Sequence, residues 1–307
     1  MPENLPSGAP PAPDIWSNWL LHVRGGGDTA YAASVQETIA AYADIVVDGA
    51  RLAAGDTLLD IGSGDGLVAF RAIARNGPSL AVILTDISAP LLRHAKALAQ
   101  EAGFAGQCRF LLAEATSLAA VESDSVDAVT SRSALAFVAD KAAAFRECHR
   151  ILKPGGRLSI AEPVFGEEAL QTIALRMTLE ARGANNSEKF LPLLYRWKSA
   201  QFPDTEAKMA ANPLTNYTGE DLRRLAQDAG FETINLETRG HAVAAHPVTW
   251  DIFIHRSPHP MAPSLRTIMQ TEFSPEERDY FESRIRPALD VTTPNPATLT
   301  YLTAEKI

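Results

Sequence analysis

A cluster of glycines and acidic residues near residue 60 is the part of the sequence best suited to bind a ligand. Asp60 is followed by Gly62, Ser63, Gly64 and Gly66, directly after an apolar run that is typical of a strand. Glycines at a strand end allow a sharp turn and a close approach of the backbone to a ligand, because they carry no Cβ atom. In doubly wound α/β proteins such turns bind ligands at the carboxyl ends of the strands. The loop therefore predicts a cofactor site.

The spacing of these glycines separates two kinds of nucleotide cofactor. A dinucleotide-binding loop follows the pattern G-x-G-x-x-G, which would place its third glycine at position 67, where this chain has Leu67. The pattern present is G-x-G-x-G, which does not favour pyrophosphate binding. An NAD-dependent dehydrogenase is therefore the least favoured enzyme class, and nicotinamide binding would test it.

A second acidic residue stands where a ribose would be bound. Asp86 ends a predicted strand over 81–87 and follows Gly66 by 20 residues. A carboxylate at this point can accept hydrogen bonds from both ribose hydroxyls, and the alternative for Asp86 is a structural role in a turn. Glu114 and Ala115 follow the next predicted strand, so they are expected at the same edge of the sheet.

Alternating strands and helices must position these residues. Short apolar strands are predicted over 57–61, 81–87, 108–113, 126–131 and 157–163, with helices over 67–76, 89–102 and 141–152. Lys153, Pro154, Gly155 and Gly156 are expected to stop the last of these helices and turn the chain into the fifth strand. A helix over 219–229 and strands over 232–239 and 298–305 complete the pattern. Apolar strands separated by helices indicate a doubly wound, mostly parallel seven-stranded α/β sheet covered on both faces.

The remaining segments are predicted to form a cap and two insertions. We expect a flexible leader over 1–13, an N-terminal helical cap over 14–50, and a core over 51–163 that continues over 218–239 and ends with a strand over 297–307. A helical substrate lid is predicted over 164–217 and a second lid insertion over 240–296. A helix that begins after Ser274, Pro275, Glu276 and Glu277 could close the cavity or pair with a second subunit, so a homodimer is one expectation.

The residues from Leu58 to Gly66, LLDIGSGDG, resemble the first motif of the class I S-adenosylmethionine (SAM)-dependent methyltransferases. The similarity extends from about residue 57 to residue 163. Asp127 with the Ala-Val that follows it, and ILKPGGR from Ile151 to Arg157, match later landmarks of that family. The resemblance implies the Rossmann-like methyltransferase fold and SAM as the cofactor.

The resemblance also implies roles for the cofactor-binding residues. The glycine loop would wrap the methionine and ribose of SAM, with Asp60 at the methionine end. Asp86, with Ile87 beside it, would bind the ribose hydroxyls. Glu114 and Ala115 would lie beside the adenine. Further candidates for cofactor contact are Ser131 at the end of the fourth strand and, from the N-terminal cap, Arg24 and Tyr31.

Methyl transfer from SAM requires alignment of the acceptor, exclusion of water and removal of a proton. Arg132 could bind a carboxylate or phosphate of the acceptor, the carboxylate of SAM, or a structural partner. Glu162 could act as a general base or be satisfied by the lid. The second insertion contributes the candidate base His241, because histidine titrates near neutral pH. Its other histidines are His246, His255 and His259.

Absent motifs narrow the acceptor. In the family that this chain resembles, an Asp/Asn-Pro-Pro-Tyr motif marks members that methylate planar nitrogens of bases or amides. No such motif follows Ser131, so the resemblance implies that these acceptors are less favoured. Cys108 and Cys148 also do not form the cysteine cluster that arsenic methyltransferases use. The predicted function is transfer of the SAM methyl group to an oxygen or carbon nucleophile of a small metabolite. The alternatives are a cyclase or lyase that releases methylthioadenosine from SAM, and a non-catalytic SAM-binding protein.

The composition limits the domain organisation, the partners and the cellular location that can be expected. The chain has 307 residues, 46% of them apolar, and a formal charge of −9, which suits one large domain with insertions and disfavours nucleic acid as a partner. No apolar run reaches the length that crosses a membrane and no secretory leader is visible, so we expect a cytoplasmic protein with no membrane partner. The spacing of histidines and cysteines predicts no metal site.

Overall fold

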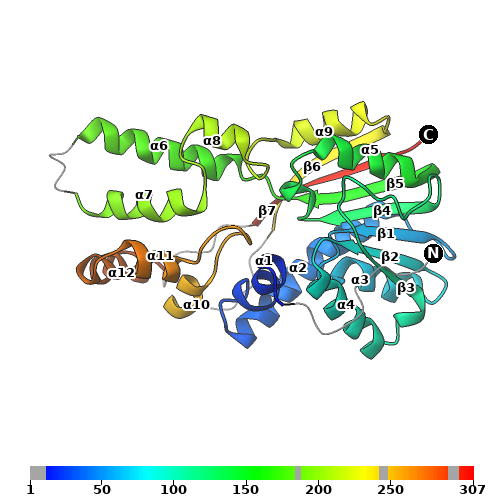
Figure 1. The fold of residues 1–307 in the computed structure, drawn as a ribbon, viewed down its shortest axis with the longest axis horizontal. Coiled ribbons are helices and arrows are strands. Elements are labelled where there is room, and N and C mark those ends of the chain that lie inside the picture. The colour runs from blue at the N-terminus through cyan, green and yellow to red at the C-terminus, as the bar shows by residue number, and fades with distance from the viewer. Residues whose placement is uncertain (1–11, 184–187, 242–247, 290–296) are drawn as a thin grey trace.

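A computed structural model describes residues 12–183, 188–241, 248–289 and 297–307. Residues 1–11 of the predicted leader, His246 and parts of both predicted insertions lie outside the described residues. The chain forms a seven-stranded sheet with helices on both faces, and a group of helices beside one end of that sheet (Figure 1).

The sheet has the strand order β3-β2-β1-β4-β5-β7-β6. The strands are β1 (Thr57–Ile61), β2 (Ala81–Asp86), β3 (Cys108–Leu112), β4 (Val126–Arg132), β5 (Leu152–Glu162), β6 (Glu232–His241) and β7 (Ala297–Glu305). Strands β1 to β5 pair in parallel, whereas β7 runs antiparallel to both β5 and β6. The predicted fold class, a doubly wound and mostly parallel seven-stranded sheet, is therefore confirmed. The strand order reverses between β1 and β4, where such sheets bind ligands.

The start of β5 differs from the prediction. The segment from Lys153 to Gly156 was expected as a turn, but β5 already begins at Leu152, which pairs with Val126. Pairing becomes regular only from Arg157, after a shift in register. Gly155 has a φ of +81° and its N–H donates to the carbonyl of Lys306. The glycines therefore form an irregular piece of strand rather than a separate turn.

Helices cover both faces of the sheet, and each side has its own apolar core. One face packs against α2 (Thr29–Ala50), α3 (Leu67–Asn76) and α4 (Ala89–Glu101). The other packs against α5 (Lys141–Ile151) and α9 (Gly219–Asp228) (Figure 1). Helix α4 begins where Ser88 accepts a hydrogen bond from the N–H of Leu91 and Pro90 fills the first turn. This cap fixes the turn that follows β2.

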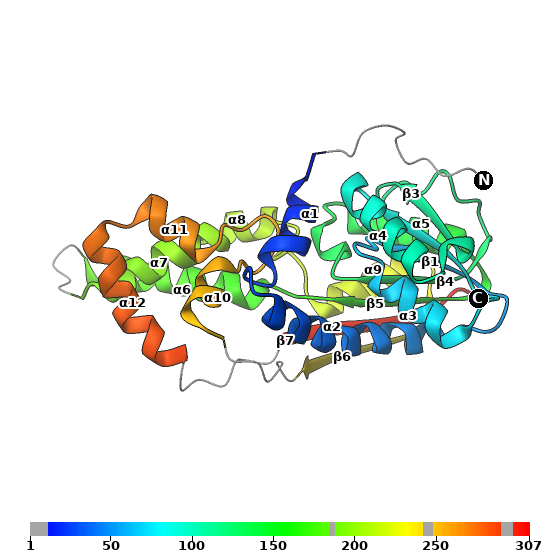
Figure 2. The same cartoon turned by 90° about the horizontal axis from the view of Figure 1, so that it is seen from below.

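The helices of the two predicted insertions pack against one another. Their helices are α6 (Gly166–Arg182), α7 (Phe190–Gln201), α8 (Glu206–Ala211), α10 (Trp250–His255), α11 (Leu265–Glu272) and α12 (Pro275–Leu289). Leu193 of α7 shares one apolar cluster with Leu265 of α11 and Phe281 of α12. Figure 2 shows these helices as one body beside the sheet. The helix predicted to begin after the segment 274–277 is present as α12, which already starts at Pro275.

The N-terminal segment lies between the sheet and this helical body. It consists of α1 (Ile15–Asn18), a π-helical turn η1 (Trp19–Val23) and the glycine turn that precedes α2. Asp28 caps α2 by accepting a hydrogen bond from the N–H of Tyr31. The indole Nε1–H of Trp19 donates to the carbonyl of Ser257, 3.2 Å away, so the cap is tied to the loop after α10. Among the described residues, no helix is long and apolar enough to span a membrane.

Candidate active site

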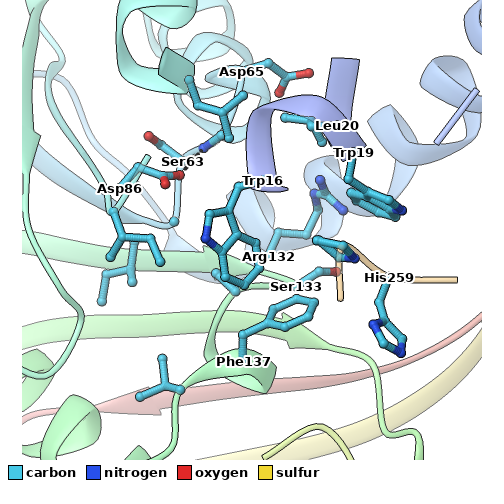
Figure 3. Close-up of a pocket in the computed structure, with 18 of the residues that line it drawn as sticks. Trp16, Trp19, Leu20, Ser63, Asp65, Asp86, Arg132, Ser133, Phe137 and His259 are labelled. Carbon is cyan, nitrogen blue, oxygen red and sulfur yellow. Dashed lines mark hydrogen bonds between the residues drawn. The ribbon is translucent and has the colours of Figure 1, made fainter. Parts of the chain in front are cut away.

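A cavity of about 310 Å³ lies at the carboxyl ends of β1, β2, β4 and β5. The N-terminal segment and the loop between α10 and α11 cover it (Figure 3). Its polar part is lined by the glycine loop and the ends of β2 and β4: Gly62, Ser63, Gly64, Asp65, Asp86, Arg132 and Ser133. Its covering part is mainly apolar: Trp16, Trp19, Leu20, Phe137, Val138, Pro163, Phe165, Pro258, His259 and Pro260.

The glycine loop has the backbone that its sequence requires. Gly62 and Gly64 have φ values of +61° and +57°, which side chains other than glycine rarely adopt. A Cβ atom on Gly62 would lie 2.2 Å from the Cβ atom of Ala134 after β4. The backbone N–H of Ser63 donates to the carbonyl of Thr85 on β2, at 2.9 Å. The loop is thus held against the neighbouring strands with its glycines on the cavity wall.

Asp86 joins the end of β2 to this loop. One carboxylate oxygen accepts a hydrogen bond from the N–H of Gly64 at 2.9 Å, and the other accepts from the N–H of Ser88 at 2.8 Å. Burial raises the pKa of Asp86, and these N–H groups oppose the shift because they stabilise the ionised carboxylate. A carboxylate can accept about four hydrogen bonds, so Asp86 keeps acceptor capacity for a ligand in the cavity.

Two buried oxygens beside the loop lack hydrogen-bond partners within the described part of the chain. They are Oδ2 of Asp60 and Oγ of Ser63. The other carboxylate oxygen of Asp60 accepts a hydrogen bond from Thr130 at 2.8 Å. Burial raises the pKa of Asp60 to about 7, against the opposing hydrogen bond from Thr130 and the positive charge of Arg132. Buried polar atoms are nearly always satisfied, so these two atoms indicate a polar ligand.

The residues predicted beside the ribose and adenine divide between cavity wall and surface. Ile87 and Ala115 line the cavity, and the half-exposed Ile87 side chain offers it an apolar surface. Glu114 is exposed and bonds with Thr116, and it is not among the lining residues. Its contact with adenine remains a prediction.

Two guanidinium groups give the cavity its positive charge. Arg24 hydrogen-bonds to Gln36 and lies 3.9 Å from a carboxylate oxygen of Asp65. Burial and the nearby charge of Arg132 lower the pKa of Arg24 to about 10. Arg24 therefore remains charged at neutral pH, and both arginines line the same cavity. An anionic group bound here would relieve their mutual repulsion.

Glu162 and Ser131 lie directly behind the cavity wall. The carboxylate of Glu162 is fully buried and accepts hydrogen bonds from Ser131 Oγ and from the N–H groups of Ala134, Leu135 and Ala136, at 3.0 to 3.4 Å. Burial raises the pKa of Glu162, and these donors oppose the shift. Glu162 thus holds the loop after β4, whose residues Ser133 and Ala134 do reach the cavity.

Three other predicted site residues, Tyr31, Gly66 and His241, are not among the residues that line the cavity. Tyr31 is buried under Arg256, whose guanidinium lies 5.0 Å from its ring. Gly66 is the N-cap residue that precedes α3 and has a φ of +84°. His241, at the end of β6, contacts the hydroxyl of Tyr301 at 2.7 Å and the ring of Tyr42 at 4.2 Å. Because these residues do not line the cavity, their roles in binding or catalysis stay predictions.

Several lining residues were not predicted as site residues. Asp65 could have been found because it lies within the glycine loop itself. Trp16 and Trp19 both line the cavity, and the Trp16 ring contacts Phe137 edge to face at 5.0 Å. Phe165 and His259 reach the cavity through the packing of the helical body, which no local pattern reveals. Among the described residues, no group of three histidine, cysteine or acidic side chains could hold a metal ion.

Comparisons with known proteins identify the family of this chain from its sequence and its fold from solved structures. The family model described as "Methyltransferase domain" matches residues 52–230. The ubiquinone/menaquinone biosynthesis C-methyltransferase UbiE of Klebsiella pneumoniae (strain 342) is 26% identical over 189 residues, which cover 62% of this chain and 71% of that protein.

Two solved structures share the fold. A putative methyltransferase bound to the Trm112 activator of Haloferax volcanii has a TM-score of 0.54 at 17% identity and covers 97% of this chain and all of that chain (100%). The [4+2]-cyclase SpnF has a TM-score of 0.51 at 19% identity and covers 87% of this chain and 81% of that one.

Proposed function

The chain belongs to the methyltransferase-domain family and is a SAM-dependent methyltransferase of small molecules, and we propose that its acceptor is an apolar metabolite methylated at carbon or oxygen. One observation carries this proposal. The polar glycine loop and an apolar wall rich in aromatic rings meet in a single cavity of about 310 Å³. Ligand sites of this kind are mainly apolar, with a few polar groups that fix orientation.

The residues of the cavity fit SAM. Asp86 has acceptor capacity for the ribose hydroxyls, and Ile87 offers an exposed apolar surface for the adenine. The unpartnered oxygens of Asp60 and Ser63 suit the amino and carboxylate groups of the methionine. We propose that Arg24 and Arg132 both serve that carboxylate, because both guanidinium groups line the cavity and lie close enough for Arg132 to lower the pKa of Arg24. When bound, SAM supplies an electrophilic methyl group on a positively charged sulfur.

The covering segments would orient the acceptor and exclude water. Trp16 and Phe137 present aromatic rings in contact with one another, and Trp19 is fixed by its hydrogen bond to Ser257. Aromatic rings stack favourably on planar apolar molecules. UbiE is named a C-methyltransferase of quinone biosynthesis, which supports a carbon nucleophile on a planar acceptor for this chain as well. We propose that the helices of the two insertions form the acceptor side of the cavity.

Glu162 is proposed as a positioning residue. Its carboxylate holds the N–H groups of Ala134, Leu135 and Ala136, so its oxygens are already engaged away from any acceptor. A fully buried carboxylate with several donors has no direct path to a substrate proton. Its effect on catalysis would pass through the loop that carries Ser133 and Ala134 to the cavity.

A product assay tests the proposed function. Purified protein is incubated with SAM and panels of planar apolar phenols and quinols, polar amines, and no acceptor, and adenosyl products are separated by chromatography. S-adenosylhomocysteine that appears only with the planar apolar panel supports the proposal. Methylthioadenosine without any acceptor would instead identify a cyclase or lyase, and turnover of polar amines alone would refute an apolar acceptor.

The assembly and location of the protein remain proposals. The helix α12 lies at the outer side of the helical body and is available in the described structure to pair with a second copy (Figure 2). Light scattering during size-exclusion chromatography would show a mass near twice 33.1 kDa if the chain is a homodimer. Fractionation of cells would test the expected cytoplasmic location.

A further inference from the structure

His259 occupies an unusual position on the acceptor side of the cavity. It lies in the loop between α10 and α11, lines the cavity and is only 5% exposed. Figure 3 shows it at the opposite end of the view from Asp86, beyond Phe137. A buried histidine next to the apolar wall and away from the ribose end is placed where an acceptor would be bound.

One ring nitrogen of His259 is fixed by the protein. Nε2 lies 3.1 Å from the carbonyl oxygen of Gln201 at the end of α7. A carbonyl oxygen can only accept, so Nε2 must carry the hydrogen. In the neutral ring the other nitrogen, Nδ1, then has a free lone pair. The contact with Gln201 therefore selects the tautomer in which Nδ1 is the base.

The other ring nitrogen is left without a partner. Nδ1 is buried and has no hydrogen bond from any of the described residues. Pro258 and Pro260 flank the histidine, and neither has a backbone N–H that could donate to it. Buried polar atoms are nearly always hydrogen-bonded, and His259 lines the cavity, so the missing partner of Nδ1 points to a group on the ligand.

The surroundings hold the ring in place. The rings of Phe165 and Phe202 lie 5.9 and 5.6 Å from the imidazole, and the carbonyl of His259 accepts hydrogen bonds from Ser257 Oγ and the N–H of Ala262. Burial lowers the pKa of His259, and the contact with Gln201 opposes the shift, so the ring is neutral at physiological pH. The charged groups on the elements around it are otherwise engaged: Asp204 bonds with Lys208, Arg256 lies over Tyr31, Lys198 lies over Trp197, and Arg24 and Arg132 line the cavity.

We propose that His259 is the general base of this enzyme, with Nδ1 accepting the proton of the acceptor. This inference rests on the proposed function. As the carbon or oxygen of the acceptor bonds to the methyl carbon, the sulfur keeps the electron pair of the broken bond and the acceptor proton passes to Nδ1. The positive charge moves from sulfur to the imidazole, which releases the proton to water when the products leave. His259 thereby replaces His241 as the candidate base, because His241 is not among the cavity-lining residues.

A spectroscopic experiment tests this without a known acceptor. The histidines are labelled with ¹⁵N, and His259 is assigned by its loss in His259→Gln. Its tautomer and pKa are then measured with S-adenosylhomocysteine and with SAM, which differ by one methyl group and one positive charge. We expect the Nε2–H tautomer, and a pKa at least about 0.5 lower with SAM, because the sulfonium repels a nearby imidazolium. His149, which contacts Gly230 and Phe231 away from the cavity, should keep its pKa.

The outcomes separate the two proposals. If both ligands bind but the pKa of His259 is the same with each, His259 is remote from the methyl group and the inference is wrong, while the proposed function stands. If neither ligand binds to folded protein, the proposed function itself fails.

An activity measurement completes the test once an acceptor is found. The amide of His259→Gln can keep the hydrogen bond to Gln201 but cannot take up a proton. We expect kcat to fall about 100-fold or more, with the Kd for SAM unchanged and the dependence of kcat on imidazole ionisation lost. His149→Gln is the matched control and should retain kcat. Retention of kcat within about twofold in His259→Gln would overturn the role of His259 as base.

Discussion

The carboxylate of Asp86 accepts a hydrogen bond from the backbone N–H of Gly64, 2.9 Å away. This contact connects the end of β2 with the glycine loop that follows β1, across 22 residues of sequence. The acidic residue thus shapes the loop and offers its remaining lone pairs to a ligand. Binding of the ribose and the conformation of the loop should therefore respond together when Asp86 is changed.

Replacement of Asp86 by Asn should weaken SAM binding. An amide offers one oxygen acceptor where the carboxylate offers two, so either Gly64 or Ser88 loses its partner. Hydrogen bonds to charged groups contribute about 1.5–3 kcal/mol, so we expect the Kd to rise about 10- to 100-fold. Calorimetry measures this, and Asp124→Asn, on an exposed aspartate paired with Lys306, is the control. Equal affinities for Asp86→Asn and the control would show that Asp86 does not bind the cofactor.

Replacement of Gly62 by Ala should destabilise the protein more than replacement of a glycine that has a positive φ but open space around it. Gly62 and Gly77 both have positive φ values, of +61° and +82°, but only at Gly62 would a Cβ atom meet another atom, 2.2 Å away. We expect Gly77→Ala to cost about 1–3 kcal/mol of stability, because its φ of 82° and ψ of −170° lie in a region that glycine alone adopts readily. Gly62→Ala should cost more and should also weaken SAM binding. Urea unfolding and calorimetry on both variants check this, and equal losses would mean that the contact with Ala134 relaxes freely.

Removal of the Glu162 carboxylate should destabilise the fold. Glu162→Ala leaves Ser131 and three backbone N–H groups buried without their acceptor, so we expect a loss of about 3 kcal/mol or more. Glu162→Gln keeps one oxygen and should lose about 1–3 kcal/mol, because its amide N–H₂ faces a donor. The free energy of unfolding in urea is the measurement, with the exposed Glu122→Ala as reference. A fully stable Glu162→Ala would exclude the proposed positioning role.

The affinity for SAM should fall in mild acid. The pKa of Asp60 is raised to about 7, so its carboxyl gains a proton as the pH falls through this value and then no longer attracts the SAM ammonium group. At pH 6 about one tenth of the carboxyl is ionised, so the Kd should rise about tenfold relative to its value well above pH 7. The window is pH 5.5 to 7.5, below the α-amino pKa of about 8. Asp60→Asn should bind weakly and should lack this component of the pH dependence. An unchanged slope in the variant would assign the effect to another group.

Much of the core could be predicted from the sequence because local rules determine it. The observed bounds of β1 and α3 are those predicted, since an apolar run, a glycine turn and an amphipathic segment follow one another there. The start of β5 was missed because proline and glycine favour a turn locally, whereas pairing of Leu152 with Val126 extends the strand. Tertiary pairing overrides local propensity in such cases.

The acceptor side was much less predictable. The two insertions look unrelated in sequence, yet Leu193 and Phe281 belong to one apolar cluster. His259 has a turn-like sequence around it, and its significance depends on Gln201, 58 residues earlier. Likewise, the sequence places Glu162 at the end of a strand but does not reveal that N–H groups of the loop after β4 donate hydrogen bonds to its carboxylate. Each of these roles arises from contacts between distant segments, which periodicity and spacing do not encode.

Direct titration of the purified protein with SAM, S-adenosylhomocysteine and NAD by calorimetry tests the central claim most directly. We predict micromolar binding of both sulfur compounds at one site per chain, with no binding of NAD. Folded protein that binds neither sulfur compound would contradict the assignment of this cavity to SAM.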